Sequence, residues 1–83
     1  MSYEKVAKAK SKVIIGTKQT LKAMKNSEII EVVIARDAER RVTEKVESLA
    51  KQANIPITHV DSMRELGKAC GIDVGAATVA IKK

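Results

Sequence analysis

Apolar residues along this chain recur with two different periods, and the alternation between these periods predicts the secondary structure. In some segments they recur every three or four residues, as on one face of a helix, and in others they form short β-branched runs. We expect helices over residues 3–10, 17–26, 37–53 and 62–70, and strands over residues 12–15, 30–35, 57–60 and 77–81.

Helix ends are indicated by polar residues next to these periodic segments. We expect Thr17 to cap the helix over residues 17–26, and Asp37 to cap the longest helix. Asn54 suits the end of that helix, since Pro56 cannot continue it. Ser62 and Glu65 form a capping box at the start of the last helix. The inward face of the longest helix is expected to carry Val42, Val46, Leu49, Ala50 and Ala53.

The order of these elements predicts the fold class. Helices and strands alternate with short connections, and the nearly continuous apolar run Ile30–Ala35 is typical of a strand covered on both faces. We expect an α/β fold with a small mixed or parallel sheet and helices on both faces. A chain of 83 residues has room for a single domain, residues 1–83.

The amino-acid composition limits the cellular compartment that we expect for this protein and the kinds of site that its residues could form. With aromatic residues at 1% of the chain, the core must be aliphatic. One cysteine cannot form an internal disulfide, and no Cys/His cluster suits zinc. No apolar run approaches the about 18 residues of a membrane span, and the N-terminus does not resemble a signal peptide. We expect a cytoplasmic protein without cofactor, metal or membrane partner.

Positive charge is concentrated in the first third of the chain. The net charge is +6, and residues 1–30 contribute +5 of it, from seven lysines and two glutamates. A pI near 9.7 favours a nucleic-acid partner. The alternatives are a solvated lysine-rich surface, or an anionic membrane surface. The membrane is disfavoured because no helix pairs this charge with bulky insertion residues.

Candidate catalytic side chains are isolated from one another in the sequence. His59 lies in a predicted strand without a second histidine, cysteine or serine placed near it. Cys70 falls on the apolar face of its helix, which predicts a buried, inert thiol. Met24 and Met63 occur at core spacing and are expected to pack. We assign no catalytic residue.

The segment that begins at Gly16 is more informative. A glycine allows close approach of the backbone to a ligand, and the start of the following helix presents free N–H groups and a positive dipole end. Lys18, Lys22 and Lys25 form one outward stripe, and Gln19 can donate and accept hydrogen bonds. This pattern favours phosphate contacts with an amide at a base edge. An ordinary glycine turn followed by a solvated helix face would have the same pattern.

A second segment, Gly71–Ala77, places Ile72 and Val74 between two glycines. If exposed, these side chains would form an apolar shelf for an unstacked base, with Lys68 adding a cation nearby. Both could instead point into the core. The scarcity of aromatic residues, with Tyr3 as the single one in the sequence, argues against an RRM-type sheet surface and against an OB-fold.

Two stretches, Gly16–Lys22 with the strand Glu31–Ala35, and Glu65–Ile81, resemble the L7Ae/L30e family of ribosomal proteins over nearly the whole chain. The short length resembles the short bacterial members of the YbxF type. The resemblance implies a three-layer α/β/α sandwich with a small mixed four-stranded sheet. It also implies binding of kink-turn RNA, in which tandem sheared G·A pairs bend the duplex and one base is extruded.

The same resemblance assigns RNA contacts to particular positions. It implies helix contacts from Gly16, Thr17, Lys18, Gln19 and Lys22, and loop contacts from Ile72, Asp73 and Val74. Many family members carry Asn-Glu where this chain has Lys18-Gln19, so a cation and an amide replace an amide and a carboxylate acceptor. The L30e branch has a similar Lys-Gln pair.

These observations lead to one main hypothesis and two rivals. We expect a non-catalytic, monomeric protein that recognises and stabilises kink-turns in ribosomal or regulatory RNA and has no small-molecule substrate. The first rival is a protein-interaction module of a ribonucleoprotein assembly. The second is a small enzyme with a phosphorylated ligand at Gly16, although no acid, base or nucleophile accompanies it. The expected RNA-binding residues are Gly16, Thr17, Lys18, Gln19, Lys22, Lys25, Lys68, Ile72, Asp73 and Val74.

Overall fold

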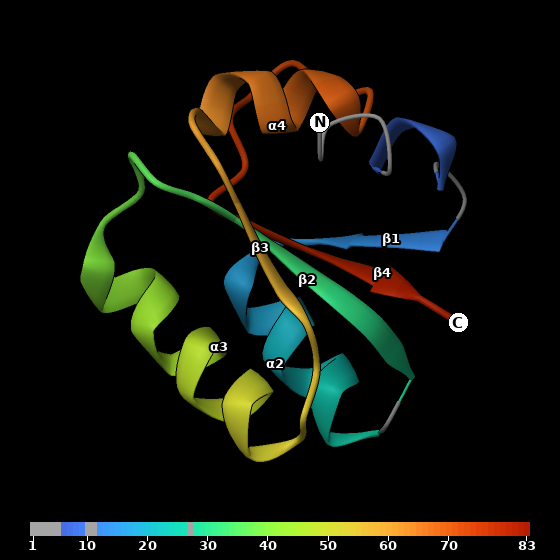
Figure 1. Cartoon of the computed structure of the whole chain (residues 1–83). Coiled ribbons are helices and arrows are strands. Elements are labelled where there is room, and N and C mark those ends of the chain that lie inside the picture. The colour runs from blue at the N-terminus through green and yellow to red at the C-terminus, as the bar shows by residue number, and fades with distance from the viewer. Residues whose placement is uncertain (1–5, 10–11, 27) are drawn as a thin grey trace.

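A mixed four-stranded sheet lies between two helical layers in the computed structural model, which describes residues 6–9, 12–26 and 28–83 (Figure 1). This confirms the three-layer α/β/α fold. The helices α2 and α3 cover one face of the sheet, and α4 covers the other. The strands are β1 (Val13–Ile15), β2 (Ile29–Ala35), β3 (Ile57–Val60) and β4 (Thr78–Lys82), and the helices are α2 (Thr17–Lys25), α3 (Arg40–Gln52) and α4 (Met63–Ala69).

The predicted elements agree with these bounds to within a few residues. Of the first predicted helix, residues 3–10, residues 6–8 are helical, whereas residues 3–5 and residue 10 lie outside the described part of the chain. No helix within the described residues combines the length and apolar character that a membrane crossing requires.

The strand order and directions place the starts of three helices at one end of the sheet. The order is β1-β4-β2-β3, in which β4 is antiparallel to both β1 and β2, and β3 is parallel to β2. The last residues of three strands, Ile15, Ala35 and Val60, therefore share one end of the sheet with Thr78, the first residue of β4. We call this end the helix-start end, because α2, α3 and α4 each begin a few residues beyond it.

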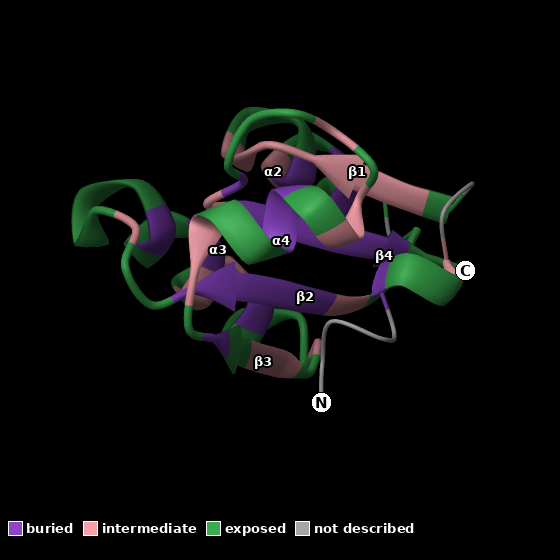
Figure 2. Cartoon of the chain, turned by 90° about the horizontal axis from the view of Figure 1, so that it is seen from above, coloured by how far each residue is buried: buried purple, intermediate pink, exposed green. Residues whose placement is uncertain are grey.

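The core consists of two aliphatic clusters on opposite faces of the sheet. Along β2, Val33 and Ala35 pack toward α4, while Val32 and Ile34 pack toward α2 and α3. All of these four side chains are buried, as expected for a strand covered on both faces. Figure 2 shows the buried stretch along β2 and β4 beneath α4.

The expected cap at Asp37 is wrong. The helix α3 begins at Arg40, and its N-cap is Glu39, without a side-chain hydrogen bond. The Asp37 carboxylate instead accepts a hydrogen bond from the Met63 backbone N–H at 2.8 Å, at the start of α4. Because β2 and β3 end side by side, the turn after β2 reaches the helix that follows β3.

Two further predictions about helix ends are confirmed, and two about the buried face of α3 are wrong. The Ser62 hydroxyl accepts from the Glu65 N–H at 3.2 Å, which confirms that cap. Asn54 has φ 58° just beyond α3, in the left-handed conformation common after a helix end. Val42, however, is 37% exposed, and Thr43 takes the buried position beside it. Ala53 is exposed as well.

Gly67 provides the space in which α4 packs against the loop that follows it. A Cβ atom at Gly67 would lie 2.0 Å from the Val74 carbonyl oxygen, which belongs to backbone and cannot rotate away. Alanine normally stabilises a helix by about 1 kcal/mol relative to glycine. At this position the sign should be reversed.

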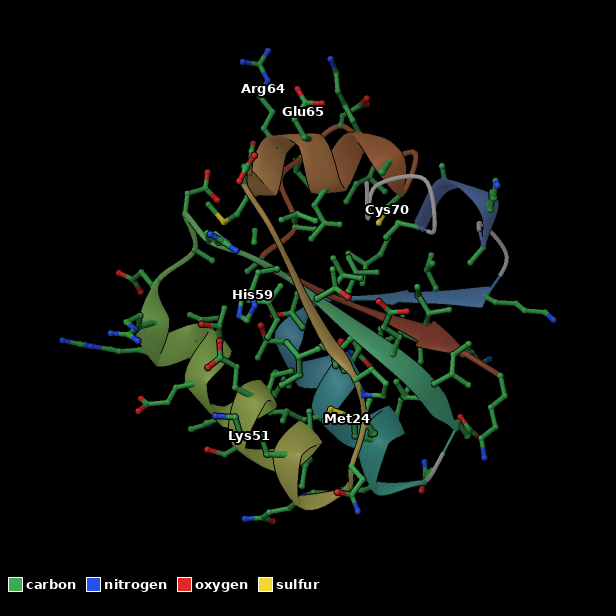
Figure 3. The ribbon with its side chains drawn as sticks, viewed as in Figure 1. Met24, Lys51, His59, Arg64, Glu65 and Cys70 are labelled. Atoms are coloured by element: carbon green, nitrogen blue, oxygen red, sulfur yellow. The ribbon has the colours of Figure 1, made fainter. Side chains whose placement is uncertain are left out.

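We expect Gly67→Ala to lower the free energy of unfolding by about 1–3 kcal/mol, in the range of overpacked cores. Urea unfolding followed by circular dichroism measures this change. Arg64→Ala serves as the control, because this exposed side chain of α4 points away from the protein (Figure 3). A Gly67→Ala variant more stable than the wild type would contradict close packing of the loop on α4.

Candidate nucleic-acid interface

The start of α2 is fixed to the start of β4 by backbone contacts at Gly16. Gly16 is the N-cap of α2, and its φ of 106° is a backbone conformation that residues other than glycine rarely adopt. Its N–H donates to the Thr78 carbonyl oxygen at 3.0 Å, and its own carbonyl accepts from the Thr20 N–H at 3.0 Å. Thr17, predicted to be the cap, is instead the first residue of the helix, and its hydroxyl donates to Thr78 Oγ1 at 3.4 Å.

The first turn of α2 presents a positive end to solvent. All residues of α2 are described, and none in its first turn is acidic. Its first backbone N–H groups have no acceptor within the helix. Lys18, Gln19 and Lys22 are exposed, as expected for an outward stripe. An anionic or electron-rich group would therefore be stabilised at this position.

The loop of residues 71–77 runs back along α4 toward the helix-start end. The Ile72 N–H donates to the Gly67 carbonyl at 3.1 Å, and the Ala76 N–H donates to the Met63 carbonyl at 2.9 Å. Val74 is 69% exposed, and Ile72 is half-buried. The sequence left open whether these side chains point into the core, and the structure places Val74 in solvent. Asp73, between them, is also exposed.

The two predicted segments meet at Thr78. The loop leads directly into this residue, and the Gly16 N–H binds its carbonyl. Both segments are therefore anchored at the same end of the sheet. Lys68 is exposed on α4, and its carbonyl accepts from the Gly71 N–H where the loop begins. Lys25 is the most distant member of the predicted set, at the last residue of α2 and about 10 Å from Lys18 along the helix axis.

Sequence reasoning missed three arginines at the helix-start end. Arg36 directly follows β2, and Arg40 and Arg41 are the first residues of α3. All three are exposed. They were overlooked because residues 31–83 have a net charge of only +1, and a sum over a segment conceals where its charges lie. The available signal was the position of Arg36 directly after a buried strand.

Three side chains with possible chemical roles, those of His59, Met24 and Cys70, lie in different surroundings. The His59 imidazole Nε2 lies 3.1 Å from Glu47 Oε1 on α3 (Figure 3). Met24 is buried in the core. Burial raises the pKa of the half-buried Cys70 thiol, so the neutral form is favoured. Within the described residues, no three His, Cys, Asp or Glu side chains come together in a group that could hold a metal ion.

Some known proteins are similar to this chain in sequence, and others are similar in fold. "RNA-binding protein BH0128" of Halalkalibacterium halodurans is 66% identical over 83 residues, covering 100% of both chains. "RNA-binding protein YbxF" of Geobacillus stearothermophilus is 58% identical over 81 residues, covering 98% of both. Among solved structures, the Giardia lamblia 15.5kD RNA binding protein superposes with a TM-score of 0.89 at 23% identity, covering 94% of this chain and 68% of its own.

The family model of the ribosomal proteins L7Ae, L30e and S12e and of Gadd45 matches residues 1–83. This match agrees with the resemblance found in the sequence and with the three-layer fold. The chain therefore belongs to the ribosomal protein L7Ae/L30e/S12e/Gadd45 family.

Proposed function

We propose that this chain is a non-catalytic RNA-binding protein that recognises and stabilises a kink-turn, in which residues 1–83 act as one monomeric domain. The observation that carries the proposal is the junction of Gly16 with Thr78, which anchors a cationic helix start and an exposed aliphatic loop at one end of the sheet. Relatives of closely similar length and sequence are named as RNA-binding proteins. The RNA would be ribosomal or a structured regulatory transcript.

The helix start would supply the polar part of the contact. Lys18 and Lys22 project from α2 without intervening acidic residues in its first turn, which suits phosphate oxygens. Gln19 is exposed between them and carries both a donor and an acceptor for a base edge. Many family members carry an Asn-Glu pair where this chain has Lys18-Gln19. Because lysine is a cation and asparagine is neutral, the pair in this chain would shift the contact toward phosphate.

The loop would supply the apolar part of the contact. Val74 and the exposed part of Ile72 offer an aliphatic surface against which an extruded base could lie. A straight duplex has no extruded base and would leave this surface in water. A protein that binds the bent form better than the straight form shifts the RNA toward the bent form. Shape selection would thus come from using both segments together.

The direct test compares an RNA that contains a kink-turn with a straight duplex of the same length and composition. We expect tighter binding of the kinked RNA in a gel-shift or calorimetric titration, because only this RNA engages both the helix and the loop. The salt concentration must be held constant, since phosphate contacts depend strongly on it. Equal affinity for the two RNAs would refute shape recognition. Absence of RNA binding would favour the protein-interaction module.

The proposed phosphate contact of Lys22 is tested by its salt dependence. We expect Lys22→Ala to weaken binding of the kinked RNA and to reduce the log–log slope of affinity against salt by about one unit. Lys51→Ala is the matched control, because Lys51 is an exposed lysine in the last turn of α3, away from the helix-start end. A slope that changes equally in both variants would show that Lys22 makes no specific contact.

The proposed base contact of Val74 is tested by truncation. We expect Val74→Ala to weaken binding of the kinked RNA about five- to ten-fold, the size expected when two methyl groups that RNA would partly bury are lost. Binding of a straight duplex should be unchanged. Ile30→Ala is the matched control, because Ile30 is 50% exposed and lies near the opposite end of β2. If Val74→Ala instead lowers the free energy of unfolding more than Ile30→Ala does and leaves RNA affinity unchanged, Val74 has only a packing role.

A further inference from the structure

A continuous row of residues crosses the sheet at the helix-start end. The Gly16 N–H binds the Thr78 carbonyl, Thr78 pairs with Ile34, and Ile34 pairs with His59. Neighbouring strands are about 4.8 Å apart, so His59 lies about 14 Å from Gly16 along this row. The Thr78 and His59 side chains contact α2 and α3 respectively, so the row has one common face.

A cavity of about 370 Å³ lies at the far end of this row, between the ends of β2 and β3 and the first half of α3. Its polar lining comes from Arg36, Arg40, Thr43, Glu47 and His59. No acidic residue occurs in the first turn of α3. The cavity therefore combines two guanidinium groups, an imidazole paired with the Glu47 carboxylate, and the start of a helix whose N-cap is Glu39.

The cavity carries more positive than negative charge, because two arginines and one glutamate line it. Its one carboxylate, on Glu47, is hydrogen-bonded to His59 at 3.1 Å. Over the described parts of the chain, the side chains of Arg36 and Arg40 make no hydrogen bond or ion pair. Asp37, the nearest acid in sequence to Arg36, does not line the cavity, and its carboxylate binds the Met63 N–H. Two planar donor groups are thus without a hydrogen-bond partner among the described residues, and one of them, on Arg40, also lines a neighbouring pocket with Glu44 and Glu47.

We propose that this cavity binds a phosphate group of the same RNA that contacts the start of α2, with Arg36 and Arg40 as its ligands. This inference rests on the proposed function. Guanidinium groups match the geometry of phosphate oxygens through paired N–H donors. A backbone phosphodiester fits better than a free phosphate, because one polyanion can occupy both the start of α2 and a cavity about 14 Å away on the same face. The RNA-binding surface then includes the ends of β2 and β3.

The experiment compares two double variants of the whole chain that remove equal charge. Arg36→Gln with Arg40→Gln empties the cavity of its cations. Lys51→Gln with Lys82→Gln removes two exposed cations from the last turn of α3 and the last residue of β4, away from the cavity. Affinity for a kink-turn RNA is measured between 50 and 200 mM salt, and circular dichroism verifies that each variant is folded.

We expect the arginine variant to reduce the log–log salt slope by about two units, with little change in the lysine variant. Over this fourfold range of salt, the wild type would then lose about sixteen-fold more affinity than the arginine variant. Equal slopes in the two double variants would overturn the proposal. This comparison of slopes does not depend on whether the wild type prefers kinked to straight RNA, so failure of kink recognition would be seen separately.

A second measurement tests whether the cavity binds a phosphate group of RNA or a free phosphate ion. Amide chemical shifts of residues 36–43 are followed by NMR during titration with inorganic phosphate and, separately, with the RNA. We expect RNA to shift these amides in the wild type and not in the arginine variant. Inorganic phosphate should have little effect at millimolar concentration. Saturation by inorganic phosphate, with an unchanged RNA salt slope in the arginine variant, would show a free-anion site and overturn the assignment to RNA.

Discussion

The pairing of β4 between β1 and β2 fixes the positions of both segments of the candidate interface, which are the start of α2 and the loop of residues 71–77. Thr78 begins this strand, is fully buried, and accepts the Gly16 N–H while it pairs with Ile34. A slip of one residue in this register would turn the buried side chains of β4 to the opposite face. The start of α2 and the end of the loop of residues 71–77 would then no longer meet. The candidate interface therefore depends on the same hydrogen bonds that hold the sheet together.

The three helices that begin at this end differ in how their free N–H groups are satisfied. The start of α4 receives the Ser62 hydroxyl and the Asp37 carboxylate, and Glu65 lies in its first turn. The starts of α2 and α3 have neither a side-chain cap nor an acid in the first turn. Anionic ligands are favoured at such uncapped starts. Protein groups thus stabilise the start of α4, whereas α2 begins after Gly16 and α3 after Glu39, neither of which provides a side-chain cap hydrogen bond.

Much of the fold followed from the sequence because periodicity and turn residues are local signals. The run Ile30–Ala35, the Ser62 cap and the left-handed Asn54 were each decided by neighbouring residues. The error at Asp37 had a tertiary cause, since its acceptor role depends on β2 and β3 ending side by side. The exposure of Val74 depends likewise on Gly67, which lets the loop pack against α4. For the candidate site, the segment at Gly16 could be predicted from its own residues, whereas a charge sum over residues 31–83 concealed Arg36, although Arg36 directly follows a buried strand.

Binding of RNA at the helix-start end is tested most directly by amide chemical shifts of the whole chain during titration with a kink-turn RNA. We expect the largest changes in residues 16–22, 36–43 and 71–77, which are far apart in the sequence and lie at one end of the sheet. Residues 51–56 and 82–83, at the opposite end of the sheet, should change little. Changes concentrated in residues 51–56 and 82–83, with residues 16–22 unaffected, would show that RNA binds elsewhere on the protein.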